Sequence, residues 1–443
     1  MVRLWRPGRR SIAVGVIAAL AVCAASIPLY RAVRRSAAPP PGVRNDPARL
    51  DSERVDRLRA LGYLDFVPPR TDGEKEGVVT HLDAVYPGYN FFTAPFVCMA
   101  VLMDNAGRVV NFWREEKSCD RWANARILTS GDVLVIGRDP ATHPGDDLDS
   151  RRFLMKVSWT GETLWKRSLP AHHDVEVLPS GDLLVLTTES RIIPAIDAKN
   201  PVHDNQITRL SPDGEVRDVL SLYDLFRSAP RLAPIQTVHP DDQNEIDLFH
   251  ANSIERMRPP ASAARPGDPL YADSNVLLTT RHQDIVAVVD WNARKLVWAW
   301  GQGVLSGPHN ATLLPNGNFL IFDNGLKRGW SRVVEVDPAE KKIVWQYAAP
   351  KKEEFFTVAR GSNQLLPNGH VLVAESDEGR AFEIDRSGTI VWEFLNPFKN
   401  AEGARATIVR MNRIERGTVE AVLRTRGEGR EDPPRRIRTG RRE

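Results

Sequence analysis

The fold is decided by two neighbouring stretches, VEVDPAEKKIVW at residues 334–345 and LPNGHVLVAE at residues 366–375. Each joins two short apolar segments through a polar turn, and the second turn contains Asn-Gly. Asn-Gly, Asp-Gly and Ser-Gly turns between alternating apolar segments are the strongest short-range signal for a β-hairpin. The two hairpins in succession therefore predict four consecutive antiparallel strands.

Both units recur along the chain. The first, a strand, a turn close to D-x-x-G and a strand that mostly ends in Trp, has six copies: VLMDNAGRVVNFW, VSWTGETLW, LSPDGEVRDVL, VVDWNARKLVW, VEVDPAEKKIVW and EIDRSGTIVW. The second alternates with it as LTSGDVLVIG, LPSGDLLVLT, a variant ending in DSNVLLTT, LPNGNFLIFD and LPNGHVLVAE, and we expect a degenerate sixth copy in ATIVRMNRIERGTVEAVL. Four strands in each period of about 47 residues are typical of a β-propeller. The sequence predicts an all-β, six-bladed β-propeller.

The tryptophans of the first unit return at one position, as in Trp298, Trp345 and Trp392. Tryptophan offers a large apolar surface that suits the contact between two packed sheets. We expect these side chains to pack between blades and not to bind a ligand.

The chain outside the propeller has a different composition. Residues Ser11–Tyr30 are apolar or small and are flanked by arginines, which is typical of an export signal or a membrane anchor. We therefore expect an exported protein, periplasmic or otherwise extracytoplasmic, that the N-terminal helix can hold at the inner membrane. The predicted organisation is an anchor or signal at residues 1–35, a Pro-rich linker with a short helix at 36–75, the propeller at 76–423 and a basic flexible tail at 424–443.

Charge is distributed unevenly along the chain. The net charge is +3, but residues 1–35 carry +7 and residues 424–443 carry +4, which leaves −8 for the body. An acidic body argues against nucleic acid as a partner. Cys98 and Cys119 are either a disulfide or two buried thiols, while Cys23 lies in the apolar run, and no Cys/His spacing typical of a metal site is present.

Histidines recur at one register of the second unit. His173 and His309 each lie six residues before the proline of an L-P-x-G turn, and His250 takes the same position in the variant unit. Two other copies have Gly361 and Ala123 there. Because the innermost strands of a propeller converge on its axis, we expect the three imidazoles to meet at one mouth of the channel.

Converging imidazoles suit two chemistries, a three-histidine metal site or nucleophilic and acid–base catalysis. Arg281, at the end of VLLTTRHQD, argues against the metal because a guanidinium would repel it. A guanidinium instead binds an anion with several oxygens, through paired N–H donors. The combination predicts transfer or binding of a phosphoryl or sulfuryl ester.

Three motifs in this order, HANSI from His250, TTRHQD around Arg281 and PHNATLLPNGNFLIFDNG around His309, resemble the bacterial aryl sulfotransferases that need no nucleotide sulfate. The resemblance covers most of residues 80–420 in pattern. It implies a six-bladed propeller, in agreement with the count of repeats.

The resemblance also implies roles for individual residues. His309 would be the nucleophile that carries the sulfuryl group, His250 would support transfer, and Arg281 would hold the sulfuryl oxygens. A further catalytic histidine best fits His173, with His172 as the other candidate. The implied cycle is ping-pong: an aryl sulfate sulfurylates His309, and a phenol then takes the group.

No cofactor and no metal is implied, and the expected partners are small aryl sulfates and phenols. His172, Asn252 and His282 are expected to bind substrate. Two features depart from the family pattern: only 28 residues separate Arg281 from His309, and an anchor with a short helix replaces a strand-rich N-terminal extension.

Three other functions are compatible with parts of the sequence. The D-x-x-G-x-x-x-W units also resemble repeats of quinoprotein dehydrogenases, although those proteins typically have eight blades and a calcium site. A non-catalytic ligand-binding propeller would not need His250, Arg281 and His309 together. An aryl sulfate hydrolase would share the first half-reaction, with water as the acceptor.

Overall fold

The computed structural model describes residues 66–67, 75–115, 119–143, 146–241, 243–259 and 267–429. All of them belong to one compact unit, Leu50–Glu443. The expected anchor at Ser11–Tyr30, nearly all of the linker region at 36–75 and most of the expected tail lie outside the described residues. Among the residues that are described, no helix is both long and apolar enough to cross a membrane.

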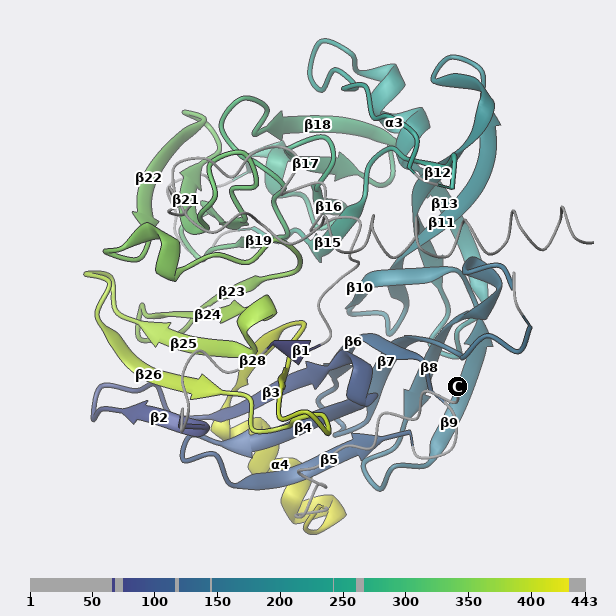
Figure 1. Cartoon of the computed structure of the whole chain (residues 1–443). Coiled ribbons are helices and arrows are strands. Elements are labelled where there is room, and N and C mark those ends of the chain that lie inside the picture. Colours follow the sequence, from purple (N-terminus) through teal and green to yellow (C-terminus); the bar gives the residue numbers. More distant parts are fainter. Residues whose placement is uncertain are drawn as a thin grey trace, which may run out of the picture. The chain divides into compact units, whose positions relative to one another are not determined.

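Six antiparallel sheets are arranged around a central axis, so the predicted all-β six-bladed propeller is confirmed (Figure 1). In each blade the strands follow one another from the axis to the rim. The innermost strands are β28 (Met411–Ile414), β6 (Arg121–Ile127), β10 (Ala171–Val177), β15 (Ala251–Arg256), β19 (Asn310–Leu313) and β23 (Ser362–Leu365). The second strands are β3 (Tyr89–Ala94), β7 (Val133–Arg138), β11 (Leu183–Ile193), β16 (Asn275–Thr280), β20 (Phe319–Asp323) and β24 (Val371–Glu375). The third strands are β4 (Met99–Asp104), β8 (Arg152–Val157), β12 (Asp197–Leu210), β17 (Ile285–Asp290), β21 (Arg332–Asp337) and β25 (Arg380–Ile384). The outermost strands are β5 (Val109–Arg114), β9 (Thr163–Ser168), β13 (Val216–Ser221), β18 (Lys295–Trp300), β22 (Lys342–Tyr347) and β26 (Ile390–Leu395).

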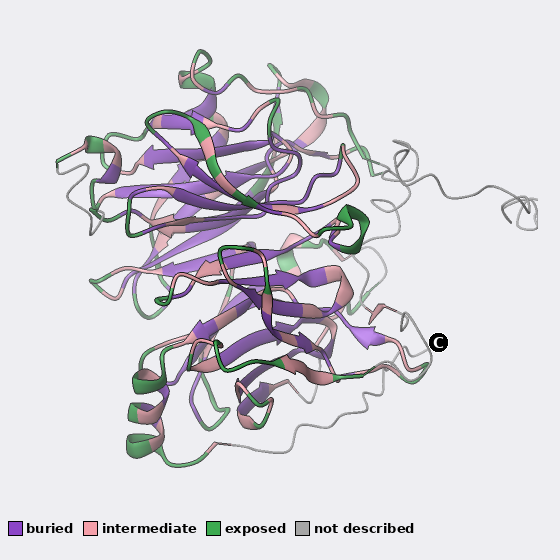
Figure 2. Cartoon of the chain, turned by 90° about the vertical axis from the view of Figure 1, so that its left-hand side faces the viewer, coloured by how far each residue is buried: buried purple, intermediate pink, exposed green. Residues whose placement is uncertain are grey.

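Burial follows the position of a strand in its blade. The second strands β20 and β24 are buried at every residue, because neighbouring blades cover both of their faces. Such strands are continuously apolar, as their sequences FLIFD and VLVAE largely are. The outer strand β22 alternates between exposed and half-buried residues before its buried last residue, whereas the inner strands of the blades are mostly buried (Figure 2).

The ring is closed by strands from both ends of the chain. The C-terminal β28 pairs with the N-terminal β3, and β2 (Gly77–His81) adds a fifth strand to the last blade by pairing with β26. The expected sixth copy of the second unit at 406–423 was therefore wrong as a local hairpin. Its first half is β28, but its second half is the helix α4 (Arg416–Arg426), since β3 already occupies the place of the second strand.

Tryptophans at the end of outer strands link several blades to the next, as expected. Trp298 Nε1 donates to the carbonyl of Pro338 at 2.8 Å, and Trp345 Nε1 donates to that of Arg386 at 3.0 Å. Both carbonyls lie in the turn between the third and fourth strands of the following blade. Trp392 donates in the same way to the carbonyl of Asn105 at 2.8 Å, which joins the last blade to the first.

The third blade carries an excursion that the repeat pattern did not predict. Strands β11 and β12 extend beyond their neighbours and pair along almost their whole length. After helix α3 (Leu222–Ser228) the chain returns as β14 (Ile246–Asp247), which pairs in parallel with β12 and places His203 opposite Asp247. Short elements complete the fold: β1 (Phe66–Val67), β27 (Arg405–Ala406) and five 3₁₀ turns at Pro95–Val97, Asp149–Arg151, Pro269–Tyr271, Lys352–Glu354 and Ser376–Glu378.

A disulfide joins Cys98 to Cys119, with their Cα atoms 6.3 Å apart. Of the two possibilities open for these cysteines, the structure therefore has the bridge. It ties the turn after β3, in the first blade, to the segment that leads into β6, in the second.

Candidate active site

Three histidines lie at the start of innermost strands, where the register predicted them. His173 lies in β10, and His250 and His309 directly precede β15 and β19. The rings of His173 and His250 are 4.8 Å apart between centroids. Both residues have a left-handed backbone, with φ of 56° and 47°. A positive φ is uncommon outside glycine and concentrates at functional sites.

The hydrogen bonds of His309 define its tautomer. Its Nδ1 lies 2.7 Å from Asn324 Oδ1 and 3.1 Å from the carbonyl of Gly307. The amide of Asn324 is oriented because its Nδ2 donates to the carbonyls of Thr357 and Arg360 at 2.9 and 2.8 Å. Two acceptors therefore face Nδ1, so Nδ1 carries the proton and Nε2 carries the lone pair.

The lone pair of His309 is available to a substrate. Nε2 is buried and has no hydrogen-bond partner, and the residue is only 4% exposed. Burial lowers the pKa of His309 well below 6.5, and the charges of Arg281 and His250 lower it further. A neutral imidazole with a free ring nitrogen is a nucleophile at neutral pH.

The loop before His309 is held rigidly. Gly307 has φ of 66°, and a Cβ atom there would lie 2.6 Å from the side chain of Leu326, so the position requires glycine. Its N–H donates to Asp284 Oδ1 at 2.7 Å. The carbonyl that accepts from His309 is thereby fixed in place.

Arg281 follows β16 and is 7% exposed. Its guanidinium contacts His282 Nε2 at 3.3 Å and donates to the carbonyl of Val358 at 3.4 Å, while Nε has no partner. None of the described carboxylates forms an ion pair with it. A buried guanidinium without a carboxylate retains N–H donors for an anionic ligand.

Asp247 connects the other two histidines of this region. Its carboxylate accepts a short hydrogen bond from His250 Nδ1, and its backbone carbonyl accepts from His282 Nδ1 at 2.5 Å. Burial raises the pKa of Asp247, but the neighbouring His250 and His282 lower it more, to well below 3.8. Asp247 is therefore ionised, and its carboxylate accepts the hydrogen bond from Nδ1 of His250.

His282 orients Arg281. Because its Nδ1–H is bonded to the carbonyl of Asp247, its Nε2 has a lone pair that accepts from the guanidinium. Burial lowers the pKa of His282 to about 3, with Arg281 contributing in the same direction. The ring remains neutral and can hold the arginine.

His172 and His173 form a second pair. His172 Nε2 donates to the carbonyl of Thr187 at 3.0 Å, so its Nδ1 accepts from His173 Nδ1–H at 2.8 Å. The lone pair of His173 therefore lies on Nε2. Burial lowers the pKa of His172 to about 3 and that of His173 well below 6.5. His173 is the member of the pair whose ring makes an edge-to-face contact with His250, and His172 holds its Nδ1 through a hydrogen bond.

Asn252 joins the HANSI motif to the nucleophile's loop. Its Nδ2 donates to the carbonyl of Pro308 at 3.0 Å, directly before His309, and its Oδ1 is buried without a partner. Asn252 therefore positions the loop, and its expected role in substrate binding stays a prediction.

The trio of Asp247, His250 and His282 could in principle hold a divalent cation, since one ligand atom from each lies within 4.8 Å of the others. In this conformation, however, the Nδ1 atoms of both rings donate to Asp247, and the other nitrogen of His282 faces Arg281. The arrangement fits a proton relay better than a metal site.

Two residues of the site were not singled out by sequence reasoning. Asp247 lies in the excursion of the third blade, outside the repeats, and Asn324 was quoted only as part of FDNG. The D-x-x-H spacing before His250 was the available signal for Asp247. For Asn324, only the tertiary contact with His309 reveals its part.

Comparison with known proteins identifies the family of this chain. The family model described as Arylsulfotransferase (ASST) matches residues 152–397, more than half of the chain. No curated protein matches. Among solved structures, a Bacteroides caccae protein of unknown function aligns over 74% of this chain and 98% of its own, with 14% identity and a TM-score of 0.48. A catalytically inactive virginiamycin B lyase from Staphylococcus aureus, determined with quinupristin, aligns over 73% and 86%, with 11% identity and a TM-score of 0.41. These two alignments carry no functional argument, but the family match does, and the chain belongs to the arylsulfotransferase family.

Proposed function

We propose that this arylsulfotransferase moves a sulfuryl group from an aryl sulfate to a phenol through a sulfohistidine at His309, without a nucleotide sulfate. The observation that carries the proposal is the buried, partner-free Nε2 of His309, whose lone pair is defined by Asn324. The uncompensated guanidinium of Arg281 supports it.

In the first half-reaction, Nε2 of His309 attacks sulfur and the S–O bond to the aryl group breaks. The leaving phenolate takes a proton from His250, whose protonated form Asp247 stabilises. Arg281 donates to the sulfuryl oxygens, on which charge is spread in the transition state. In the second half-reaction a phenol returns its proton to His250 and attacks sulfur, which regenerates neutral His309.

The experiment that tests the proposal measures the intact mass of the protein after incubation with p-nitrophenyl sulfate alone. We expect one added sulfuryl group per chain, lost again when phenol is supplied together with formation of phenyl sulfate. Release of nitrophenol at an equal rate with and without phenol, and without a labelled protein, would instead identify a hydrolase.

The rate of the first half-reaction should be nearly independent of pH between 7.5 and 5.5. For an imidazole with an ordinary pKa of 6.5, the neutral fraction falls about tenfold over this interval. The pKa of His309 is lowered, so its neutral, nucleophilic form persists to lower pH. The rate of the nitrophenol burst, measured by rapid mixing, should therefore change by less than about twofold. A tenfold decline of this rate would contradict the tautomer and the burial argued for His309.

Replacement of Asp247 by asparagine should matter most for poor leaving groups. Without the carboxylate, His250 loses the group that stabilises its protonated form, and general acid catalysis is typically worth about 10²–10⁴ in rate. We expect the variant to lose roughly 10²-fold in kcat/KM with phenyl sulfate, but less than about tenfold with p-nitrophenyl sulfate, whose phenolate needs little protonation. Equal losses of kcat/KM with both donors would show that Asp247 has only a structural role. Asp273→Asn, at an exposed carboxylate on another loop, is the matched control.

A further inference from the structure

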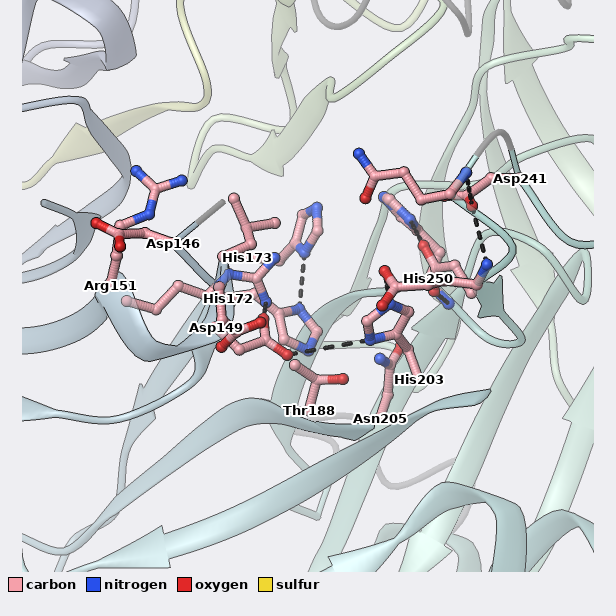
Figure 3. Close-up of a pocket in the computed structure, with 16 residues that line it drawn as sticks. Asp146, Asp149, Arg151, His172, His173, Thr188, His203, Asn205, Asp241 and His250 are labelled. Carbon is pink, nitrogen blue, oxygen red and sulfur yellow. Dashed lines mark hydrogen bonds and ion pairs between the residues drawn. The ribbon is translucent and has the colours of Figure 1, made fainter. Parts of the chain in front are cut away.

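A cavity of about 520 Å³ lies beside His173 and His250, on the side toward the third blade (Figure 3). It is formed by the segment before β8, by β10 to β12 and by the return loop that ends in β14. Both histidines line it, and His250 with its partner Asp247 is the part of the proposed reaction centre that the cavity adjoins. The cavity is therefore placed to hold the part of a substrate that lies beyond the reacting oxygen.

The lining of this cavity is strongly acidic. Its six carboxylates are Asp146, Asp147, Asp149, Asp241, Glu245 and Asp247. The lining contains two guanidinium groups, Arg151 and Arg152, so four negative charges are in surplus when the imidazoles are neutral. A surplus of two remains even when His203 and His250 are both protonated.

The two arginines do not neutralise the centre of this surface. Arg152 pairs with Asp149 at 3.0 Å, and Arg151 faces Asp120, outside the lining, at 3.8 Å. Asp147 and Asp241 accept backbone N–H groups and form no ion pair with any of the described cations. Burial raises the pKa of Asp149, and the negative charges of Asp147 and Glu245 add to this effect, which is the direction expected where carboxylates crowd together.

The remaining lining is polar and partly unsatisfied. Thr188 is 6% exposed, and its Oγ1 is buried without a hydrogen-bond partner. Its neighbour Asn205 uses its Oδ1 for the N–H of Ala251 at 2.7 Å, which leaves the amide N–H₂ at the cavity. Leu148 is the one aliphatic side chain among the lining residues, so the surface offers little to an apolar tail.

We propose that this acidic cavity binds a cationic amino group on the acceptor phenol, so that the preferred acceptors are phenols that carry an ammonium group. The proposal rests on the proposed sulfuryl transfer. The phenolic hydroxyl lies at His250, and the ammonium group lies among the carboxylates, where it replaces water as the hydrogen-bond donor. The negative surface also disfavours carboxylate-bearing phenols, so the selectivity contains a repulsive as well as an attractive part.

Three acceptors of similar size test the charge preference: tyramine, 4-ethylphenol and 4-hydroxyphenylacetate, each with p-nitrophenyl sulfate as donor. At low ionic strength we expect kcat/KM for tyramine to exceed that for 4-ethylphenol by roughly tenfold, with the acid lower still. Added salt should shrink the differences, because exposed charges are screened. Equal kcat/KM values for the three acceptors would overturn the proposal.

The double variant Asp147→Asn/Asp241→Asn tests whether these two carboxylates cause the preference for tyramine. Both side chains are exposed and outside the proposed catalytic groups, and asparagine keeps their size and their acceptor oxygen. We expect about a tenfold loss for tyramine and no change for 4-ethylphenol. Asp213→Asn, at an exposed turn of the third blade, is the control and should change neither. A preference for tyramine that survives in the double variant would place its origin elsewhere and overturn the proposal.

Calorimetric binding without a donor separates this proposal from sulfuryl transfer itself. Tyramine should bind more tightly than 4-ethylphenol to the wild-type chain, and the difference should vanish in the double variant. If that result is obtained while no sulfuryl-protein forms, the cavity assignment stands and the proposed transfer fails. If a sulfuryl-protein forms but the two phenols bind equally, the transfer stands and the cavity assignment fails.

Discussion

Replacement of His309 by alanine should reduce nitrophenol release from p-nitrophenyl sulfate by about 10³-fold or more, and no sulfuryl-protein should form. Loss of the attacking atom abolishes the covalent pathway, so the rate falls by more than the loss of a single binding contact would cause. The buried Nε2 has no structural partner, so alanine removes little that stabilises the fold except the bond from Nδ1 to Asn324.

The control for this variant is His143→Ala. His143 has a side chain that is 82% exposed, so its loss should leave release unchanged. A His309→Gly variant provides a second measurement, because added imidazole can enter the space and restore part of the release without labelling the protein. Undiminished release in His309→Ala, with the protein still labelled, would move the nucleophile to His173 or His250.

Replacement of Arg281 by glutamine should lower kcat/KM for aryl sulfates by about 10²–10³-fold, in the range found when one oxyanion donor is removed from an active site. The loss should appear mainly in kcat, because the sulfuryl oxygens attract the guanidinium most as the S–O bond breaks. Lysine at this position should recover only part of the activity, since an ammonium lacks the paired donors of the planar guanidinium.

Arg281→Gln also removes a positive charge that lowers the pKa of His309, so its effect must be separated from a change in the nucleophile. Burial is the larger cause of that lowered pKa, and the pH profile of the burst should stay flat in the variant. Arg294→Gln is the control, because Arg294 is an exposed arginine that pairs with Asp218. An increase in KM with unchanged kcat would show that Arg281 contributes only to ground-state binding of the aryl sulfate.

Much of the fold could be predicted because each blade is built from local hairpins. The turns PNG and D-x-x-G, the alternation of apolar residues and the tryptophan at the end of the outer strand all lie within one repeat. The ring closure could not be predicted in the same way. Pairing of β28 with β3 joins residues more than 300 positions apart, and the turn signals that indicate a hairpin do not act at that separation.

The functional site, like the fold, could be predicted only where it depends on the local repeat. The register alone predicted that His173, His250 and His309 would lie at equivalent starts of innermost strands, and the structure brings the first two of these rings into edge-to-face contact. The register did not predict the role of Asp247, because β14 returns to the sheet through an excursion that belongs to no repeat. The acidic cavity, to which that excursion contributes Asp241, Glu245 and Asp247, was likewise beyond the pattern.

The sequence by itself determined the class of fold, the number of blades and the positions of the histidines and Arg281, because these depend on hairpins and a periodic register within short segments. The tertiary structure alone decided which nitrogen of His309 bears the proton, which carboxylate supports His250 and which side of the site is acidic. Those properties depend on partners brought together from different blades, such as Asn324 oriented by the carbonyls of Thr357 and Arg360. Hydrogen-bond direction and burial arise only when such distant segments meet.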